Sequence, residues 1–106
     1  IKAIATTGAK RARLMPDVPT VIEAGVPGFE VSSWHGMLAP AKVPRDIITR
    51  LNREIVAILE KPEVREALLS EGGDITPDSP EQFAAFLKSE VAKWSKVVKT
   101  AGITAE

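Results

Sequence analysis

Two short strands followed by three to four helices make up the α/β fold that this 106-residue sequence predicts. The run IKAIATT at residues 1–7 is apolar and rich in β-branched side chains, as strands are. Residues 30–39 form a second extended stretch, which lacks a helical period and lies between proline and glycine residues. From residue 44 onward, apolar side chains recur every three to four positions, which indicates amphipathic helices.

Composition argues against several classes of function. Fourteen basic residues balance fourteen acidic ones, so the chain has no overall field that would attract nucleic acid. Without cysteine it can form neither a disulfide nor a thiolate metal site. No apolar run approaches the roughly 20 residues of a membrane span. The chain begins at Ile1 and enters a strand-like run directly, so we expect it to be part of a longer product.

The first part of the chain is predicted to form a strand, a loop and a short helix. The strand at residues 1–7 ends at Gly8, and the loop GAKRARLM follows. Three cations of this loop could together hold an anion or could simply face solvent: Lys10, Arg11 and Arg13. Two prolines fix the backbone at residues 16–19. Residues 20–24 then form at most two helical turns, which Gly25 ends.

The second extended stretch is interpreted as a strand from Val31 to Leu38 that crosses from one packed unit to another. Its alternate positions give two mixed faces, neither of them cleanly apolar. Such a strand suits a buried or cleft-lining position better than a half-solvated sheet. Gly36 inside it indicates a bulge or a close approach of the backbone.

Helices are expected after the crossing. The first starts with Pro44 at its first helical position and places apolar side chains on one face. Pro62 interrupts the pattern, and a shorter helix continues until the glycine pair at residues 72–73. The last helix begins at the capping-box pattern S-x-x-Q of residues 79–82 and closes at Gly102.

One stripe of the last helix contains its large apolar side chains: Phe83, Phe86, Leu87, Val91, Trp94, Val97 and Val98. The apolar stripe of an isolated helix does not offset the entropy lost when that helix is ordered. We therefore expect a sheet or another helix to cover it.

The sequence gives little support to a catalytic or metal-binding site. A hydrolase would use Ser32 or Ser33 with His35, but no G-x-S-x-G elbow surrounds the serines. His35 is the only histidine, so a metal site would need carboxylate partners that no spacing provides. We expect no enzyme, no metal site and no cofactor. Trp34 could pack in a core or stack on a ligand in a cleft, and both alternatives stay open.

The motifs PDVPT, E-A-G, W-x-G, A-P and E-x-x-K-W follow one another along the chain. In this order they resemble the tripartite tricarboxylate transporter substrate-binding proteins, also called Bug receptors. The resemblance covers essentially the whole chain, which is similar to about the last third of such a receptor. It implies a two-lobed, periplasmic-binding-protein-like (type II) fold located in the periplasm. Such a receptor closes on a small carboxylate, without catalysis or cofactor, and delivers it to membrane permease subunits.

The same resemblance implies an assignment of segments to lobes. Residues 1–30 would be the end of the second lobe, residues 31–40 a crossover strand, and residues 41–106 the helical part of the first lobe. The cleft-facing residues would be Thr7, at a strand's carboxyl end, and Ser33, Trp34 and His35 in the crossing. Much of the ligand contact would come from a loop before Ile1, so we expect the isolated chain to bind carboxylates weakly or not at all.

A rival hypothesis is a helical interaction domain. Its exposed apolar stripes would pair with a partner protein or with a second copy of the chain, which gives a homodimer. Strand exchange between neighbouring copies would have the same effect.

Overall fold

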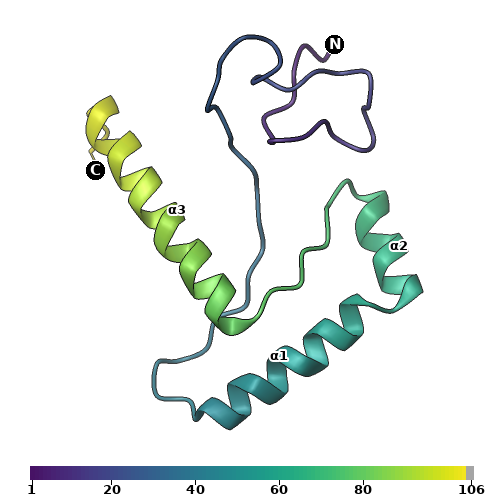
Figure 1. Ribbon diagram of the computed structural model, residues 1–106, viewed down its shortest axis with the longest axis vertical. Helices are drawn as coiled ribbons and strands as arrows, with labels where there is room; N and C mark the ends of the chain where they lie inside the picture. The colour runs from purple at the N-terminus through teal and green to yellow at the C-terminus, as the bar shows by residue number, and fades with distance from the viewer. Residues whose placement is uncertain (105–106) are drawn as a thin grey trace. The chain divides into compact units, whose positions relative to one another are not determined.

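The computed structural model describes residues 1–104 and contains three helices in that range (Figure 1). They are α1 (Arg45–Leu59), α2 (Pro62–Ser70) and α3 (Pro80–Ala101). All three lie after residue 44, where the apolar periodicity predicts helices. The helical half of the fold prediction is therefore confirmed.

Two compact units divide the chain. The first contains Ile1–Ala39 together with Glu66–Asp74. The second contains Pro40–Arg65 together with the residues from Ile75 onward. The chain thus passes from the first unit to the second after Ala39 and returns to the first for the end of α2.

The two predicted strands are absent from residues 1–104, and this part of the fold prediction is wrong. The first extended segment makes one isolated parallel bridge, between Thr6 and Thr20. Residues 31–38 have no regular secondary structure. An extended segment becomes a strand only when a neighbour offers it a row of hydrogen-bonding partners. Here the extended segments meet at single points, so no ladder forms.

Residues 21–25 form consecutive turns in place of the short helix that the sequence predicts at residues 20–24. The N–H of Ala24 donates to the carbonyl of Thr20 over 2.9 Å, and the N–H of Gly25 donates to Ile22 over 3.1 Å. Gly25 adopts a φ of 104°, a conformation that favours glycine. The predicted stop at Gly25 is therefore correct, although no helix precedes it.

A proline stands at the start of both α1 and α2. The sequence predicts Pro44 as the first helical residue of α1, but it is the N-cap, and the helix begins at Arg45. The carbonyl of Pro44 accepts the N–H of Ile48 over 3.2 Å. Helix α2 begins at Pro62. It is followed by Gly72, whose φ is 87° and whose N–H donates to the carbonyl of Leu69 over 3.2 Å. The proline and glycine signals therefore locate these helix ends to within about one residue.

Helix α3 has the capping box that its sequence predicts. The N–H of Gln82 donates to Oγ of Ser79 over 3.2 Å, and the N–H of Ser79 donates to Oε1 of Gln82 over 2.8 Å. At the other end Gly102 adopts a φ of 66° and closes the helix. Both ends of α3 are thus fixed by local chemistry.

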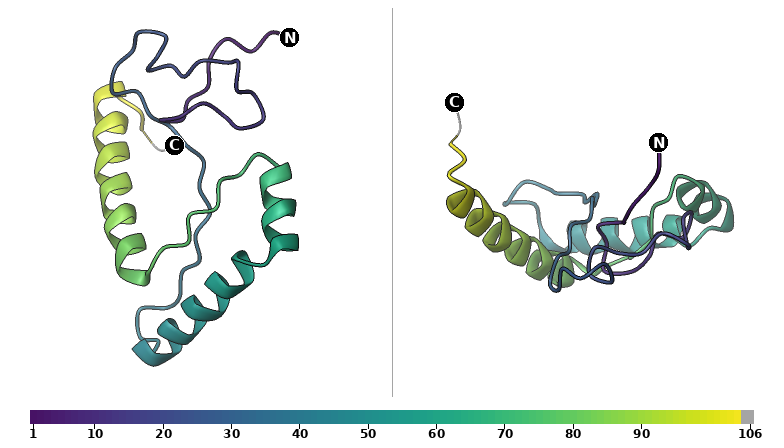
Figure 2. Two further views of the ribbon diagram at one scale, coloured as in Figure 1. Left: turned by 45° about the vertical axis from the view of Figure 1, so that its right-hand side comes forward. Right: turned by 90° about the horizontal axis from the view of Figure 1, so that it is seen from above.

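Polar anchors join α1 to α3 within the second unit. Arg45 of α1 forms an ion pair of 2.5 Å with Glu81 in the first turn of α3. The side chain of Asn52 donates to the backbone carbonyl of Asp78 over 2.9 Å. The two helices approach at their amino-terminal ends and diverge from there (Figures 1 and 2).

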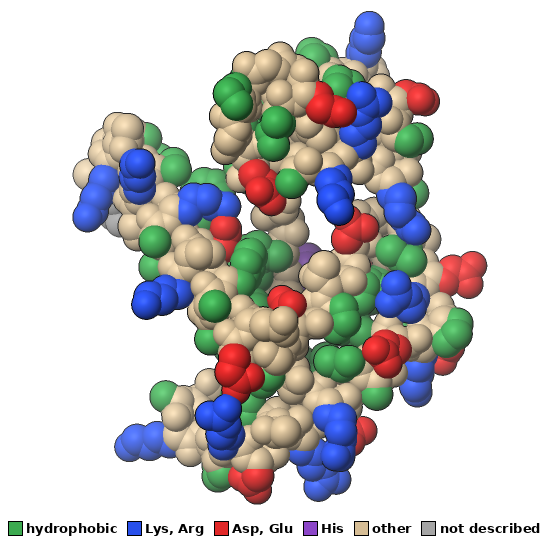
Figure 3. Space-filling view, viewed as in Figure 1, with side chains coloured by type: hydrophobic (Ala, Val, Ile, Leu, Met, Phe, Trp, Pro, Cys, Tyr) green, Lys and Arg blue, Asp and Glu red, His purple; other side chains and the backbone are tan. Residues whose placement is uncertain are grey.

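The apolar stripe of α3 remains half-exposed. Five of its seven apolar side chains are between 37% and 59% exposed: Phe86, Val91, Trp94, Val97 and Val98. No hydrophobic side chain of the described residues is fully buried, and hydrophobic side chains show on the surface of Figure 3. Residues 1–104 therefore do not supply the cover that the stripe needs.

Candidate functional site

Three segments of the first unit meet at Thr6 and Thr7. The N–H of Thr6 donates to the carbonyl of Pro19 over 2.8 Å, and the carbonyl of Thr6 accepts the N–H of Val21 over 2.9 Å. The carbonyl of Thr7 accepts the N–H of Val31 over 2.9 Å. Successive residues of an extended chain direct their backbone groups to opposite edges, so the two threonines bind a different neighbour on each edge. We call these five residues the threonine junction.

The junction places Thr7 beside the start of the segment that carries the other predicted binding residues. Ser33, Trp34 and His35 follow Val31 within four positions. All of the predicted binding residues are exposed, and Trp34 is exposed by 41%, so Trp34 does not lie in a core of residues 1–104. The backbone bond from Val31 to Thr7 is what joins the two segments.

Glycine at position 8 leaves room for the backbone of Lys10 in the loop that follows Thr7. A Cβ atom on Gly8 would stand 3.2 Å from the carbonyl oxygen of Lys10 and 3.9 Å from Oγ of Ser32. The first distance is tighter than ordinary side-chain contacts, so a larger residue would displace the loop. Gly8 is therefore suited to the bend directly after Thr7.

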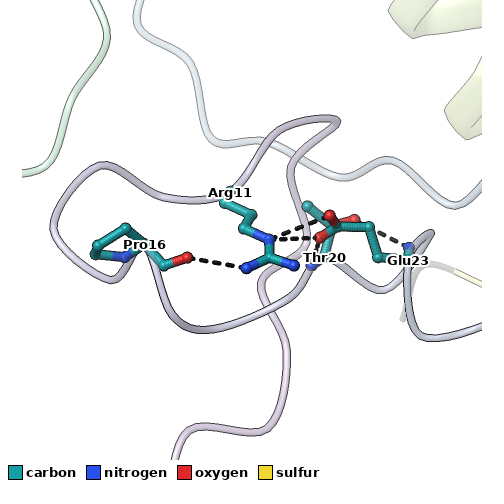
Figure 4. A network of polar contacts seen from close by, with 4 residues as sticks. All are labelled: Arg11, Pro16, Thr20 and Glu23. Atoms are coloured by element: carbon teal, nitrogen blue, oxygen red, sulfur yellow. Dashed lines mark hydrogen bonds and ion pairs between the residues drawn. The ribbon is translucent and has the colours of Figure 1, made fainter.

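Arg11 does not face solvent as a free cation, and it is not open to an anion on its Nε side (Figure 4). Its Nε donates to both carboxylate oxygens of Glu23, over 3.1 and 2.9 Å. Its Nη1 donates to the carbonyl of Pro16 over 3.1 Å. Of the three loop cations that the sequence singles out, Arg11 is thus committed to an internal ion pair.

Thr20 and Glu23 cap each other across the turn. The N–H of Thr20 donates to Oε2 of Glu23 over 2.7 Å, and the N–H of Glu23 donates to Oγ1 of Thr20 over 3.1 Å (Figure 4). Thr20 is only 2% exposed and is the one buried residue of residues 1–104. Sequence reasoning missed this pair, although T-x-x-E is a capping-box pattern.

The ion pair between Arg11 and Glu23 shifts the pKa of both side chains. Hydrogen bonds from Arg11 and then the N–H of Thr20 lower the pKa of Glu23 below its ordinary value. The Glu23 carboxylate raises the pKa of Arg11 in turn. Both groups are therefore charged at neutral pH. Their side chains are 45% and 46% exposed, so solvent screens the attraction between them.

One polar atom of the junction is buried without a partner. Oγ1 of Thr6 forms no hydrogen bond within residues 1–104. A hydroxyl in that state loses its hydration without compensation, which destabilises the fold locally.

The described residues contain no cluster of three or more metal-ligating side chains. None of their helices combines the length and apolar character that crossing a membrane requires. A shallow hollow follows the last turns of α3, between Lys93 and Ala101, within the second unit. The threonine junction belongs to the first unit.

A family model described as the tripartite tricarboxylate transporter family receptor matches residues 1–103. A protein of the tcbD–tcbE intergenic region of Pseudomonas sp. strain P51 is 40% identical over 99 residues, which cover 92% of this chain and 30% of the relative. Protein BugT of Bordetella pertussis is 33% identical over 102 residues, which cover 96% of this chain and 31% of BugT.

Two solved structures resemble this one. The structure of R. palustris Rpa4515 with adipate has a TM-score of 0.79 and 39% identity, and the match covers 92% of this chain and 33% of that protein. The periplasmic binding protein BugD has a TM-score of 0.83 and 35% identity, and the match covers 96% of this chain and 35% of BugD. The periplasmic-binding-protein-like character of the fold is confirmed by these matches.

The chain spans about a third of the length of these relatives. The family match nevertheless extends over nearly all of the chain, and it includes every residue of the threonine junction. This chain belongs to the receptor family of the tripartite tricarboxylate transporters.

Proposed function

We propose that this chain is part of a periplasmic solute receptor that binds a small carboxylate and delivers it to the membrane permease subunits of a tripartite tricarboxylate-type transporter. The ligand would be a di- or tricarboxylate or an acidic amino acid. The observation that supports this most is the likeness to R. palustris Rpa4515 with adipate, because adipate is a dicarboxylate and the folds agree over 92% of this chain.

The ligand-facing residues in this proposal are Thr7, Ser33, Trp34 and His35. Hydroxyl groups and backbone N–H groups would donate to the carboxylate, and the indole of Trp34 would cover an apolar stem. Arg11 would not contact the ligand through Nε or Nη1, because these two atoms already donate to Glu23 and Pro16. A site built from neutral donors suits a receptor, which must release what it binds.

The lobe assignment belongs to the same proposal. Residues 1–30 would end the second lobe, residues 31–40 would cross over, and residues 41–106 would form the helical part of the first lobe. The change of unit after Ala39 supports a boundary there. The return of Glu66–Asp74 to the first unit departs from this simple division.

Calorimetric titration tests the proposed function. The protein expressed from the complete reading frame that encodes these residues would be titrated with adipate, succinate, citrate and aspartate, and with hexanoate as a monocarboxylate of adipate's length. We expect saturable binding of at least one member of the panel and little binding of hexanoate. Silence across the whole panel would contradict a carboxylate receptor. The 106-residue chain alone should bind the same ligand weakly or not at all.

The half-exposed stripe of α3 favours a second candidate, a helical domain that pairs with another copy or another protein. Light scattering on the 106-residue chain distinguishes the two. A dimer that the substitution Val91→Glu dissociates would support the interaction domain. A monomer at all accessible concentrations would reject self-association.

A further inference from the structure

A single carboxylate connects the loop and the turn of the first unit. Glu23 accepts hydrogen bonds from Nε of Arg11 in the loop and from the N–H of Thr20 in the turn. Arg11 also reaches the carbonyl of Pro16, which lies between them in the chain. Hydrogen bonds to an ionised carboxylate are stronger than those between neutral groups. The turn is therefore fixed from both of its ends.

The fixed turn is bonded directly to the threonine junction. Thr20 stands between Pro19 and Val21, and these two residues hold the backbone of Thr6 on both of its polar groups. Thr6 precedes Thr7, whose carbonyl holds Val31. A continuous path of hydrogen bonds and peptide links thus leads from Glu23 to the residues proposed to face the ligand.

We propose that Glu23 is a positioning residue for carboxylate binding, which it supports by fixing the turn that holds Thr6 and Thr7. This inference rests on the proposed function, and it assigns to the E-A-G sequence a role that lies outside the ligand-facing residues. Glu23 has the wrong charge to touch a carboxylate ligand. Its effect on binding therefore passes through Arg11 and Thr20.

The geometry also defines the role of Arg11. If Arg11 bound the ligand by charge alone, lysine would replace it well. A lysine cannot reproduce the guanidinium bonds to two oxygens of Glu23 and to Pro16, because it offers one ammonium group. Arg11→Lys should therefore impair binding nearly as much as Glu23→Gln does.

The test compares Glu23→Gln with a matched control, Glu71→Gln. Glu71 is an exposed acid of the same unit and has no part in the junction. Both variants of the protein from the complete reading frame would be titrated with the carboxylate that the wild type binds, at a temperature where circular dichroism shows each to be folded. In parallel, amide hydrogen exchange would be followed at Val31 and Val21, whose N–H groups bond to Thr7 and Thr6.

We expect the dissociation constant of Glu23→Gln to be about fivefold to tenfold higher than that of the wild type. This is near the lower end of the loss of affinity that follows when a residue that orients a metal ligand is replaced. Exchange at Val31 should be faster in Glu23→Gln and unchanged in Glu71→Gln.

A purely structural role gives a different result. Glu23→Gln would then lower the midpoint of thermal unfolding but leave the affinity and the exchange at Val31 equal to those of Glu71→Gln, and this would overturn the inference. If the wild type binds no carboxylate at all, the proposed function fails, and exchange at Val31 still decides whether Glu23 fixes the junction. Faster exchange at Val31 in Glu23→Gln but not in Glu71→Gln supports the connection between Glu23 and the threonine junction. Unchanged exchange in Glu23→Gln rejects it.

Discussion

The side-chain amide of Asn52 on α1 donates a hydrogen bond of 2.9 Å to the backbone carbonyl of Asp78, the residue before the N-cap of α3. The two residues are 26 positions apart in the sequence. This bond and the ion pair between Arg45 and Glu81 fix the start of α3 against α1.

Replacing Asn52 by alanine should weaken the start of α3. The substitution removes one donor, and we expect a loss of about 1 kcal/mol in the free energy that protects the first-turn amides of α3. Amide hydrogen exchange of Phe83 measures this directly. Arg50→Ala, at an exposed position of the same helix, serves as the control. Equal exchange in the two variants would show that the Asn52 bond contributes nothing.

Loss of the α3 capping box should also be measurable. Ser79→Ala removes the oxygen that accepts the N–H of Gln82, and a lost cap typically costs about 1 kcal/mol. Circular dichroism should show less helix and an earlier melt. The control is Ser89→Ala inside the helix, where alanine has the higher helix propensity and should not reduce helicity. Identical spectra for Ser79→Ala and wild type would count against the cap.

The unsatisfied hydroxyl of Thr6 predicts a stabilising substitution. Thr6→Val keeps the shape of the side chain and removes the buried oxygen, so protection of the Val21 amide should increase by roughly 1 kcal/mol. Thr7→Val, at the exposed neighbour, should leave that protection unchanged. A less protected Val21 in Thr6→Val would mean that the hydroxyl contributes to the fold.

The stability of the first unit should depend on acid through Glu23. Its pKa is lower in the folded chain than the ordinary value of 4.5, because Arg11 and the N–H of Thr20 stabilise the carboxylate. The stabilisation is fully present above the ordinary pKa and is lost as the pH falls through the lower, folded value. Asp17 is the other charged group that acts on Arg11.

Carbon-detected NMR of the Glu23 carboxyl measures this pKa. Glu23→Gln should remove the corresponding acid-dependent loss of protection at Val21, while Glu71→Gln should retain it. A Glu23 that titrates at or above its ordinary value would contradict the ion pair.

The parts of the fold that the sequence predicts well are those that local chemistry determines. Ser79 with Gln82 and the glycine at 102 act within one helical turn of the ends they fix, so their patterns can be read directly. Strand formation depends on partners far along the chain. The β-branched composition of residues 1–7 could therefore predict extended backbone but could not predict that Thr6 would make a single bridge.

The same distinction holds for the candidate site. The hydrogen bond from Val31 to Thr7 brings Thr7 close to the stretch that begins at Val31, and the family resemblance implies that residues of both segments face the ligand. Arg11 and Glu23 are twelve positions apart in a region without helical or strand period, so no spacing rule pairs them. The Thr20–Glu23 capping box was visible as a pattern, but a capping box normally announces a helix, and here it holds a turn.

The attachment of α3 by its amino-terminal end has a thermodynamic consequence. Because the apolar stripe of α3 is already half-exposed, unfolding of α3 hydrates little additional apolar area. The heat-capacity increase on unfolding should therefore be small and the thermal transition broad. Fraying should proceed from the Gly102 end toward Ser79, because the anchoring bonds are concentrated at the latter. Residues 80–101 would then lose helical structure gradually from the carboxyl-terminal end as the temperature rises, and would not unfold in one cooperative step.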